Sequence, residues 1–196
     1  MKIILGSNSP RRREILSFFT LPFEQVSPEF DESTLPFRGD PEAFVMEMAE
    51  KKALSLASRY KEPILTADTI VFSRKKLYMK PESEEEAFQM LQELSANSAQ
   101  VFTGVCVHFG QKTLVKAAET QILFHTLTEK QIRHYQSLFD WRDRSGGFYA
   151  QKGGSIIIRQ IKGDFYNIMG LPITTTRELL SQIGIDLWNY LKPHDS

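Results

Sequence analysis

The segment Lys2-Ile-Ile-Leu-Gly-Ser-Asn-Ser-Pro-Arg-Arg-Arg-Glu14 decides how the chain begins to fold. Residues 3–5 form a short apolar run, which predicts a buried β-strand. Ser9 is a favourable helix N-cap, and Pro10 suits the first helical position, where its missing N–H removes no hydrogen bond. The segment therefore predicts a strand, a loop of small residues and a helix start, as in an α/β fold.

The same segment indicates a phosphate-binding site. The N–H groups and the positive dipole end of the helix would face the hydroxyls of Ser7 and Ser9, with Arg11 and Arg12 in the first turn. Cations at this position oppose the helix dipole, so a structural role alone explains them poorly, whereas a bound polyphosphate would reverse the conflict. The alternative is a solvated basic turn, which is what most arginine triplets are.

The overall composition argues against several classes of protein. The 196 residues include 24 Lys plus Arg and 24 Asp plus Glu, a balance unlike the basic excess of stable nucleic-acid binders. The single cysteine, Cys106, excludes an internal disulfide and is expected in the core of a protein from a reducing compartment. The chain shows no signal-peptide pattern and no apolar run of about 20 residues, so we expect a cytoplasmic protein without a membrane span.

Strand-like and helix-like segments are mixed along the rest of the chain, without an internal repeat. Capping patterns predict helix starts at Asp40-Pro41, at Ser83 with Glu86, and at Thr128 with Gln131. Further strands are expected at residues 23–26, 64–72, 101–109, 114–124 and 155–161, and a last helix over 175–183. Residues expected to face the core from the helix after Thr128 are Ile132, Tyr135, Leu138 and Phe139. The length fits one domain over residues 1–196, in which two lobes share a central sheet.

Two charged residues fall within apolar patterns. Asp68 lies in the apolar strand predicted over residues 64–72; a buried carboxylate is normally paired, bound to metal, or placed at a cleft, so Asp68 is the leading catalytic candidate. The alternative is a strand-end aspartate that accepts hydrogen bonds from backbone N–H groups. Lys52 shares an i, i+4 stripe with Phe44, Met48 and Leu56, where a lysine usually extends its stem to reach water.

Four short blocks, in order, give this chain a resemblance to a known family. Leu5-Gly-Ser-Asn-Ser-Pro-Arg-Arg12 resembles the opening signature of the Maf family of nucleoside triphosphate pyrophosphatases. The other three blocks are Ala67-Asp-Thr-Ile-Val71, Lys80-Pro81 and Gly163-Asp-Phe-Tyr-Asn-Ile-Met-Gly-Leu-Pro172. The chain departs from the family in two places: Leu94-Ser-Ala-Asn-Ser-Ala-Gln-Val101 lacks a common glycine and histidine, and Arg144-Ser-Gly146 replaces the usual Lys-Ala-Gly.

The resemblance implies both a fold and a reaction. The fold would be an elongated mixed β-sheet with flanking helices, forming two lobes around a cleft, as in Maf and inosine triphosphatase-like proteins. The reaction would be hydrolysis of dTTP or UTP, with modified pyrimidine nucleotides as further candidates, to a nucleoside monophosphate and pyrophosphate. Homodimerisation is a further family-level expectation.

The resemblance also implies roles for single residues. Asp68 would accept a proton from the attacking water, and Glu32, in the polar loop over residues 27–39, matches a Maf active-site acid. These two carboxylates are the expected ligands of Mg²⁺ or Mn²⁺, because substrate phosphates can supply the remaining oxygens. The expected phosphate-binding residues are Ser7, Ser9, Arg11, Arg12, Lys52 and Lys80.

Three positions match those linked to substrate choice in the family: Arg11, Thr69 and Gln151. The amide of Gln151 offers both a donor and an acceptor, which suits the O4 and N3–H edge of uracil or thymine. The alternative is that this side chain only caps a turn. Two other functions stay open at this point: a purine-preferring enzyme similar to inosine triphosphatase, and a regulatory module in cell division that binds nucleotide without hydrolysing it.

Overall fold

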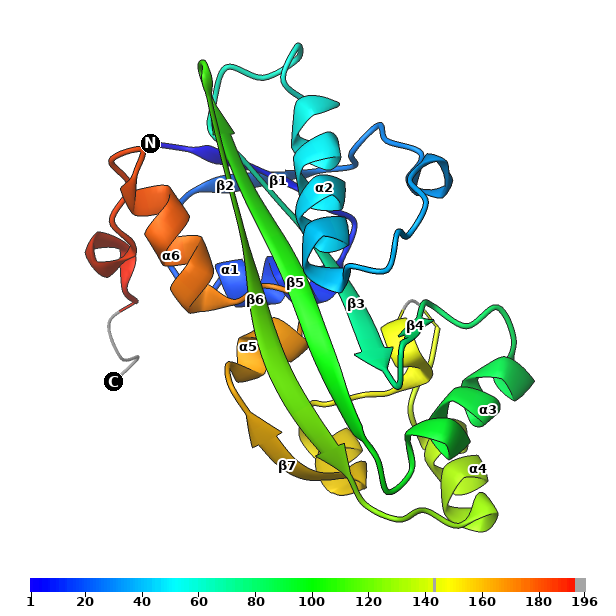
Figure 1. The fold of residues 1–196 in the computed structure, drawn as a ribbon. Coiled ribbons are helices and arrows are strands. Elements are labelled where there is room, and N and C mark those ends of the chain that lie inside the picture. Colours follow the sequence, from blue (N-terminus) through cyan, green and yellow to red (C-terminus); the bar gives the residue numbers. More distant parts are fainter. Residues whose placement is uncertain (143, 193–196) are drawn as a thin grey trace.

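A computed structural model describes residues 1–142 and 144–192 (Figure 1). Its helices and strands, in chain order, are β1 (Ile3–Gly6), α1 (Pro10–Leu16), β2 (Phe23–Val26), η1 (Glu32–Thr34), α2 (Pro41–Leu54), β3 (Ile64–Ser73), β4 (Lys76–Tyr78), α3 (Glu84–Leu94), β5 (Ser98–Phe109), β6 (Lys112–Phe124), α4 (Glu129–Leu138), η2 (Ser145–Gly147), η3 (Lys152–Ile157), β7 (Ile158–Lys162), α5 (Phe165–Ile168), α6 (Ile173–Ser181) and η4 (Leu187–Tyr190), where η marks a 3-10 helix.

The strands described form one seven-stranded mixed sheet. Its order is β2-β1-β3-β5-β6-β7, and β4 pairs with β3 beside this path. β1 runs parallel to both β2 and β3, whereas the β3–β5, β5–β6 and β6–β7 pairs are antiparallel. The sequence-based expectation of an α/β protein with a mixed sheet and flanking helices is therefore confirmed.

β1 lies at a topological switch point of the sheet. The chain leaves β1 through α1 to reach β2 on one side, and later returns to β3 on the other side. In sheets of this kind, ligands bind in the crevice outside the carboxyl ends of the strands at such a point. The loop after β1, residues 7–9, occupies this place.

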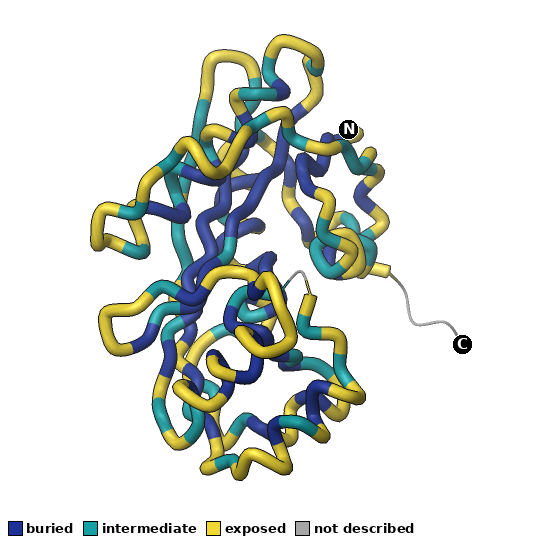
Figure 2. The backbone as a smooth tube through the Cα atoms, turned by 90° about the vertical axis from the view of Figure 1, so that its right-hand side faces the viewer, coloured by how far each residue is buried: buried dark blue, intermediate teal, exposed yellow. Residues whose placement is uncertain are grey.

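The strand β1 is buried on both faces, which explains its unbroken apolar sequence. Ile4 packs with Ala49 and Ala53 of α2, whereas Ile3 and Leu5 join a cluster on the opposite face with residues of α1 and α6. Figure 2 shows that buried residues follow the strands through the centre of the molecule, while the connecting loops are exposed. This arrangement places β1 and its loop between two helical layers.

Two lobes share the long strands β3, β5 and β6 (Figure 1). The first lobe contains α1, α2 and α6 with β1 and β2. The second lobe contains α3, α4 and β7, together with η2 and η3, and it has its own apolar cluster that includes Val101, Leu91 and Phe148. That residues 1–196 form one domain stays a prediction, because residues 143 and 193–196 lie outside the described part of the chain.

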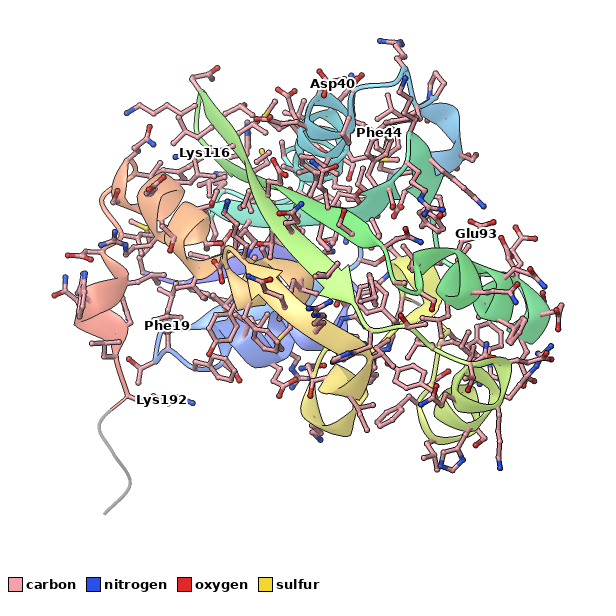
Figure 3. All side chains as sticks on the ribbon, turned by 60° about the horizontal axis from the view of Figure 1, so that its bottom comes forward. Phe19, Asp40, Phe44, Glu93, Lys116 and Lys192 are labelled. Atoms are coloured by element: carbon pink, nitrogen blue, oxygen red, sulfur yellow. The ribbon has the colours of Figure 1, made fainter. Side chains whose placement is uncertain are left out.

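Local sequence signals predicted most helix starts correctly. Ser9 caps α1 with Pro10 at its first position, and Asp40 caps α2 by accepting from two backbone N–H groups. Asp40 lies at the N-terminal end of α2 in Figure 3. Thr128 and Gln131 form the complete capping box of α4. The box at Ser83 is incomplete, because the Glu86 carboxylate accepts from the backbone N–H of residue 82 instead.

Two sequence-based expectations about the second lobe were wrong. Residues 155–157 belong to η3, so the last strand begins at Ile158 and not at Ser155, and the Ile156 side chain is exposed. Leu138, at the end of α4, is 63% exposed and does not face the core. The last helix, expected from about Thr175, is present as α6, which starts at Ile173. Among the described residues, no helix is long and apolar enough to cross a bilayer.

Candidate active site

The loop after β1 is fixed by hydrogen bonds from its own residues and from β2. The side chain of Ser9 accepts from the backbone N–H of Arg12, and the backbone N–H of Ser9 donates to Ser7 Oγ at 3.2 Å. The Gln25 amide, on the neighbouring strand β2, donates to the carbonyls of Ser7 at 2.7 Å and Ser9 at 3.3 Å. The loop therefore has one defined conformation at the N-terminus of α1, where backbone N–H groups favour an anion.

The guanidinium of Arg12 is oriented by three separate parts of the chain. Its Nη1 donates to Ser7 Oγ at 3.2 Å, its Nη2 donates to Thr69 Oγ1 at 3.0 Å, and its Nε donates to the carbonyl of Gly170 at 2.8 Å. Gly170 has φ +98°, a conformation that favours glycine, and a Cβ there would lie 3.4 Å from Arg12 Nε. The loop, β3 and the turn after α5 thus meet at this side chain.

Lys52, Asp68 and Glu32 form a charged cluster. Lys52 Nζ lies 2.5 Å from Asp68 Oδ1 and 2.9 Å from Glu32 Oε1. The side chains of Lys52 and Asp68 are 7% and 12% exposed, whereas that of Glu32 is 52% exposed. Lys52 does not extend to water as a lysine on an apolar stripe usually does, because the buried carboxylate of Asp68 supplies a closer partner.

The sheet register explains why Asp68 faces the loop after β1. β1 ends at Gly6, which pairs with Thr66 of β3, so Asp68 lies two residues beyond the carboxyl end of β1. Across the sheet Asp68 pairs with Gly104 of β5. A Cβ on Gly104 would come within 2.1 Å of the carbonyl oxygen of Val45, so this glycine lets α2 approach the sheet closely. That approach brings Lys52, two turns later on α2, to Asp68.

All ten residues selected from the sequence line one pocket with a volume of about 610 Å³. They are Ser7, Ser9, Arg11, Arg12, Glu32, Lys52, Asp68, Thr69, Lys80 and Gln151. They come from the loop after β1, the first turn of α1, η1, α2, β3, the segment after β4 and the residue before η3. Their convergence was expected from the sequence; their chemical roles are not tested by geometry.

One side of the pocket is apolar. Val71, Val101 and Phe148, from the cluster of the second lobe, line it together with Ile168. The sequence did not single these residues out as pocket residues, because apolar residues in strands are equally expected in the core. The flat face of a nucleobase can be buried against these apolar side chains, while polar groups of the pocket form hydrogen bonds to the edge of the base.

Gln151 is placed where its side chain does not serve as a turn cap. It precedes η3, and although its backbone carbonyl accepts from the N–H of Gly154, its side chain makes no capping hydrogen bond. Arg144 lines the same pocket, and its guanidinium lies 3.7 Å from the ring centre of Tyr149. Ser145 also lines the pocket, and its hydroxyl donates to the carbonyl of Thr69 at 3.1 Å. The segment after α4 is thereby attached to β3.

The carboxylates of Asp68 and Glu32 could supply only part of the coordination shell of a metal ion. Across residues 1–142 and 144–192, no group of three or more His, Cys, Asp or Glu side chains could hold a metal ion. Asp68 and Glu32 nevertheless converge on one point, because both contact the same ammonium nitrogen of Lys52. Mg²⁺ is commonly bound by one or two carboxylates with substrate phosphates and water, so these two acids fit that class of site.

Comparisons with known proteins agree on one family. The family model described as "Maf-like protein" matches residues 2–183. A dTTP/UTP pyrophosphatase of Chlamydia caviae is 42% identical over 192 residues, covering 97% of this chain and 98% of the relative. A dTTP/UTP pyrophosphatase of Clostridium perfringens is 38% identical over 191 residues, covering 95% of this chain and all of the relative.

Solved structures that align with this chain are more distant relatives in sequence. A nucleoside-triphosphatase / dITP/XTP pyrophosphatase from Mycobacterium abscessus aligns over 93% of this chain and 94% of its own, with a TM-score of 0.45 and 14% identity. The Ham1 protein of Staphylococcus aureus aligns over 97% of this chain and 94% of its own, with the same TM-score and 13% identity.

Proposed function

The chain belongs to the Maf-like protein family, and from this premise we propose that it hydrolyses dTTP and UTP to the nucleoside monophosphate and pyrophosphate. Relatives that carry this activity in their names match it over nearly the whole length of both chains. The observation that carries the proposal is that the arginines at the start of α1, a buried acid and apolar side chains line the same pocket.

In the proposed complex the phosphates lie over the loop after β1. The hydroxyls of Ser7 and Ser9 donate to phosphate oxygens at the positive dipole end of α1, with Arg11 and Lys80 as further cations. Arg12, whose planar fork can hold two phosphate oxygens at once, is already oriented by three hydrogen bonds. Binding in this geometry fixes the α-phosphorus near Asp68, which lies just beyond the end of β1.

Asp68 acts as the proton acceptor in this proposal. A water oxygen attacks the α-phosphorus, the bond from that phosphorus to the α,β-bridging oxygen breaks, and the water proton passes to the Asp68 carboxylate. Pyrophosphate leaves with the electron pair of the broken bond. Lys52 holds the carboxylate of Asp68 in place and supplies positive charge beside the reacting phosphate.

Asp68 and Glu32 would hold a divalent cation, Mg²⁺ or Mn²⁺, together with phosphate oxygens. When bound, such an ion supplies charge neutralisation for the phosphates and lowers the pKa of a coordinated water. Glu32 stands on the exposed side of the cluster, so it can turn toward an entering ligand without uncovering a buried charge.

Homodimerisation stays a prediction.

Gln151 is the residue proposed to recognise the base through hydrogen bonds. Its amide can donate to O4 and accept from N3–H of uracil or thymine, and its side chain is not engaged in capping η3. Thr69 and Arg11 line the same pocket and are the other proposed specificity positions. A cytosine, which has the opposite donor and acceptor at the corresponding edge, would require the amide to rotate.

The test is pyrophosphate release from dTTP, UTP, CTP and ITP, each with Mg²⁺, with Mn²⁺ and with chelator. We expect turnover of dTTP and UTP that requires a divalent ion. Preference for ITP would support the purine-preferring alternative, and tight nucleotide binding without turnover would support the regulatory module; either result would contradict the proposal.

A matched pair of variants tests the role of Asp68. Asp68→Asn keeps the shape of the side chain, and we expect it to lower kcat by at least about 100-fold, because a general base typically contributes 10²–10⁴-fold. The control is Asp186→Asn, which lies outside the pocket and retains an oxygen that can cap η4. If Asp68→Asn kept more than about a tenth of wild-type kcat, the role would be refuted.

A further inference from the structure

Buried polar side chains separate two apolar clusters on one face of the sheet. On β3, Ala67 belongs to the cluster of the first lobe and Val71 to that of the second. Between them Thr69 pairs with Thr103 of β5, and their hydroxyl oxygens are 3.0 Å apart. Thr103 and the adjoining Asn167 are fully buried. Polar groups are costly in such a place unless they are hydrogen-bonded, so their pattern of partners is informative.

Asn167 attaches the short helix α5 to the sheet. Its Nδ2 donates to the carbonyl of Val101 at 2.9 Å and to Thr120 Oγ1 at 3.0 Å. Thr120 in turn donates to the carbonyl of Asp164, the residue that caps α5. Within the described residues, Asn167 Oδ1 has no hydrogen-bond partner. An apolar residue would avoid this cost, so packing alone does not account for an asparagine here.

A directed series of hydrogen bonds runs from Arg12, through the hydroxyls of Thr69 and Thr103, to the carbonyl of Asn167. The Thr103 hydroxyl donates to the carbonyl of Asn167 at 3.1 Å. Because a hydroxyl has one proton, Thr69 must then donate to Thr103, and Thr69 Oγ1 accepts from Arg12 Nη2 at 3.0 Å. Each bond in such a series polarises the next one.

A second connection reaches the same guanidinium through the backbone. The carbonyl of Asn167 accepts from the N–H of Gly170 at 3.0 Å, which closes the turn after α5. The carbonyl of Gly170 then accepts from Arg12 Nε at 2.8 Å. Two of the three hydrogen bonds that orient Arg12 therefore depend on the position of Asn167.

We propose that Thr103 and Asn167 are positioning residues, which hold the Arg12 guanidinium in the plane required to bind two phosphate oxygens. Neither residue lines the pocket, so both act on the ligand through the residues that they hold, Thr69 and Arg12. This inference rests on the proposed function for its substrate, the triphosphate chain. The competing explanation is that these groups only stabilise the fold.

The experiment compares Thr103→Val, which removes one hydroxyl, with Thr103→Ser, which restores it. The matched control is Thr66→Val: Thr66 is equally buried, its hydroxyl donates to the carbonyl of Ala49 at 2.5 Å, and it faces α2 on the opposite side of the sheet. We expect Thr103→Val to raise KM for dTTP about 10-fold with a smaller change in kcat, since Arg12 binds phosphate already in the ground state. Thr103→Ser and Thr66→Val should change KM by less than about twofold.

A second measurement follows Arg12 directly. The Nε–Hε signal of Arg12, in protein labelled with ¹⁵N-arginine and assigned by its loss in Arg12→Lys, reports the hydrogen bond to Gly170. We expect this signal to shift and its proton to exchange faster with water in Thr103→Val, and to be unchanged in Thr66→Val. If Thr103→Val does not fold, Thr120→Val, which removes one anchor of Asn167, should produce the same changes to a smaller extent.

The outcomes separate this inference from the proposed function. If the protein hydrolyses dTTP but Thr103→Val matches Thr66→Val in both KM and the Arg12 signal, the positioning role is refuted while the function stands. If the protein hydrolyses no nucleotide, the function is refuted, and the positioning role is decided by the Arg12 signal and by calorimetric binding of inorganic tripolyphosphate. Failure of Thr103→Ser to restore KM would also overturn the inference.

Discussion

Replacing Lys52 by methionine should destabilise the protein much more than replacing any exposed lysine. The change leaves the Asp68 carboxylate, 12% exposed, without its cation, while the Glu32 carboxylate still points toward the same place. Removal of one partner from a buried ion pair costs about 3–5 kcal/mol. Because the pair opens onto a pocket that water can enter, we expect a loss near the lower end, about 3 kcal/mol.

The assay is urea unfolding at pH 7, followed by far-UV circular dichroism, with Lys51→Met as the matched control. Lys51 is the preceding residue on α2 and is exposed, so its replacement should change the free energy of unfolding by less than about 0.5 kcal/mol. The double variant Lys52→Met/Asp68→Asn removes both charges, and it should be more stable than Lys52→Met alone. The coupling energy between the two sites should reach about 2 kcal/mol.

Two results would refute this reasoning. One is a Lys52→Met protein as stable as Lys51→Met, which would mean that the Asp68 charge is well solvated without its partner. The other is a coupling energy below about 0.5 kcal/mol, which is the range of independent sites. Glu32→Gln gives a further comparison: its side chain is half exposed, so its loss should cost no more than about 1 kcal/mol.

Four further predictions test packing, backbone strain and burial elsewhere in the fold. Gly104→Ala should lower the free energy of unfolding by at least about 1–3 kcal/mol, because the new Cβ would overlap the carbonyl of Val45 and push α2 away. Equal urea midpoints for this variant and the wild type would contradict the close approach of α2 to the sheet. Ala96→Gly should raise stability by about 1 kcal/mol, because Ala96 has φ 59°, and an unchanged midpoint would show that the turn is not strained. Burial raises the pKa of the Cys106 thiol to about 12 from a usual 9.0. The thiol of the native protein should therefore resist thiol reagents at pH 8, and rapid labelling would disprove its burial. Above pH 9 the unfolded chain loses this proton and the native chain keeps it, so stability should fall with pH more steeply than in Cys106→Ala; parallel curves would refute the shift.

The candidate site was largely predictable because its residues come in short local patterns. The loop after β1 is recognisable from its small residues, a capping serine and a proline. Each of these residues influences the conformation of the chain only a few positions away. A carboxylate within an apolar strand is conspicuous for a similar reason: burial of an unpaired charge is too costly to be accidental. These signals, with the family resemblance, selected ten residues that do line one pocket.

The errors arose where a local pattern was compatible with two structures. Residues 155–157 have the composition of a strand, yet they form the end of a 3-10 helix, and β7 then pairs with the end of β6 in an irregular register near Phe124. Leu138 continues the apolar spacing of α4 but lies at its exposed end. Whether a spaced apolar residue is covered depends on what packs above it, and the sequence of one helix does not contain that information.

By itself, the sequence determined most of the strands and the capped helix starts, the position of β1 in a buried sheet, the identity of the charged residues and the family. Only the tertiary structure decided which charges are partners. Lys52 turns inward because Gly104 lets α2 approach Asp68, and Arg12 is oriented because Asn167, 155 positions later in the chain, fixes the turn that contacts it. The physical reason is range: capping and strand burial depend on neighbours in sequence, whereas ion pairs and buried hydrogen bonds depend on distances that exist only after the sheet has formed.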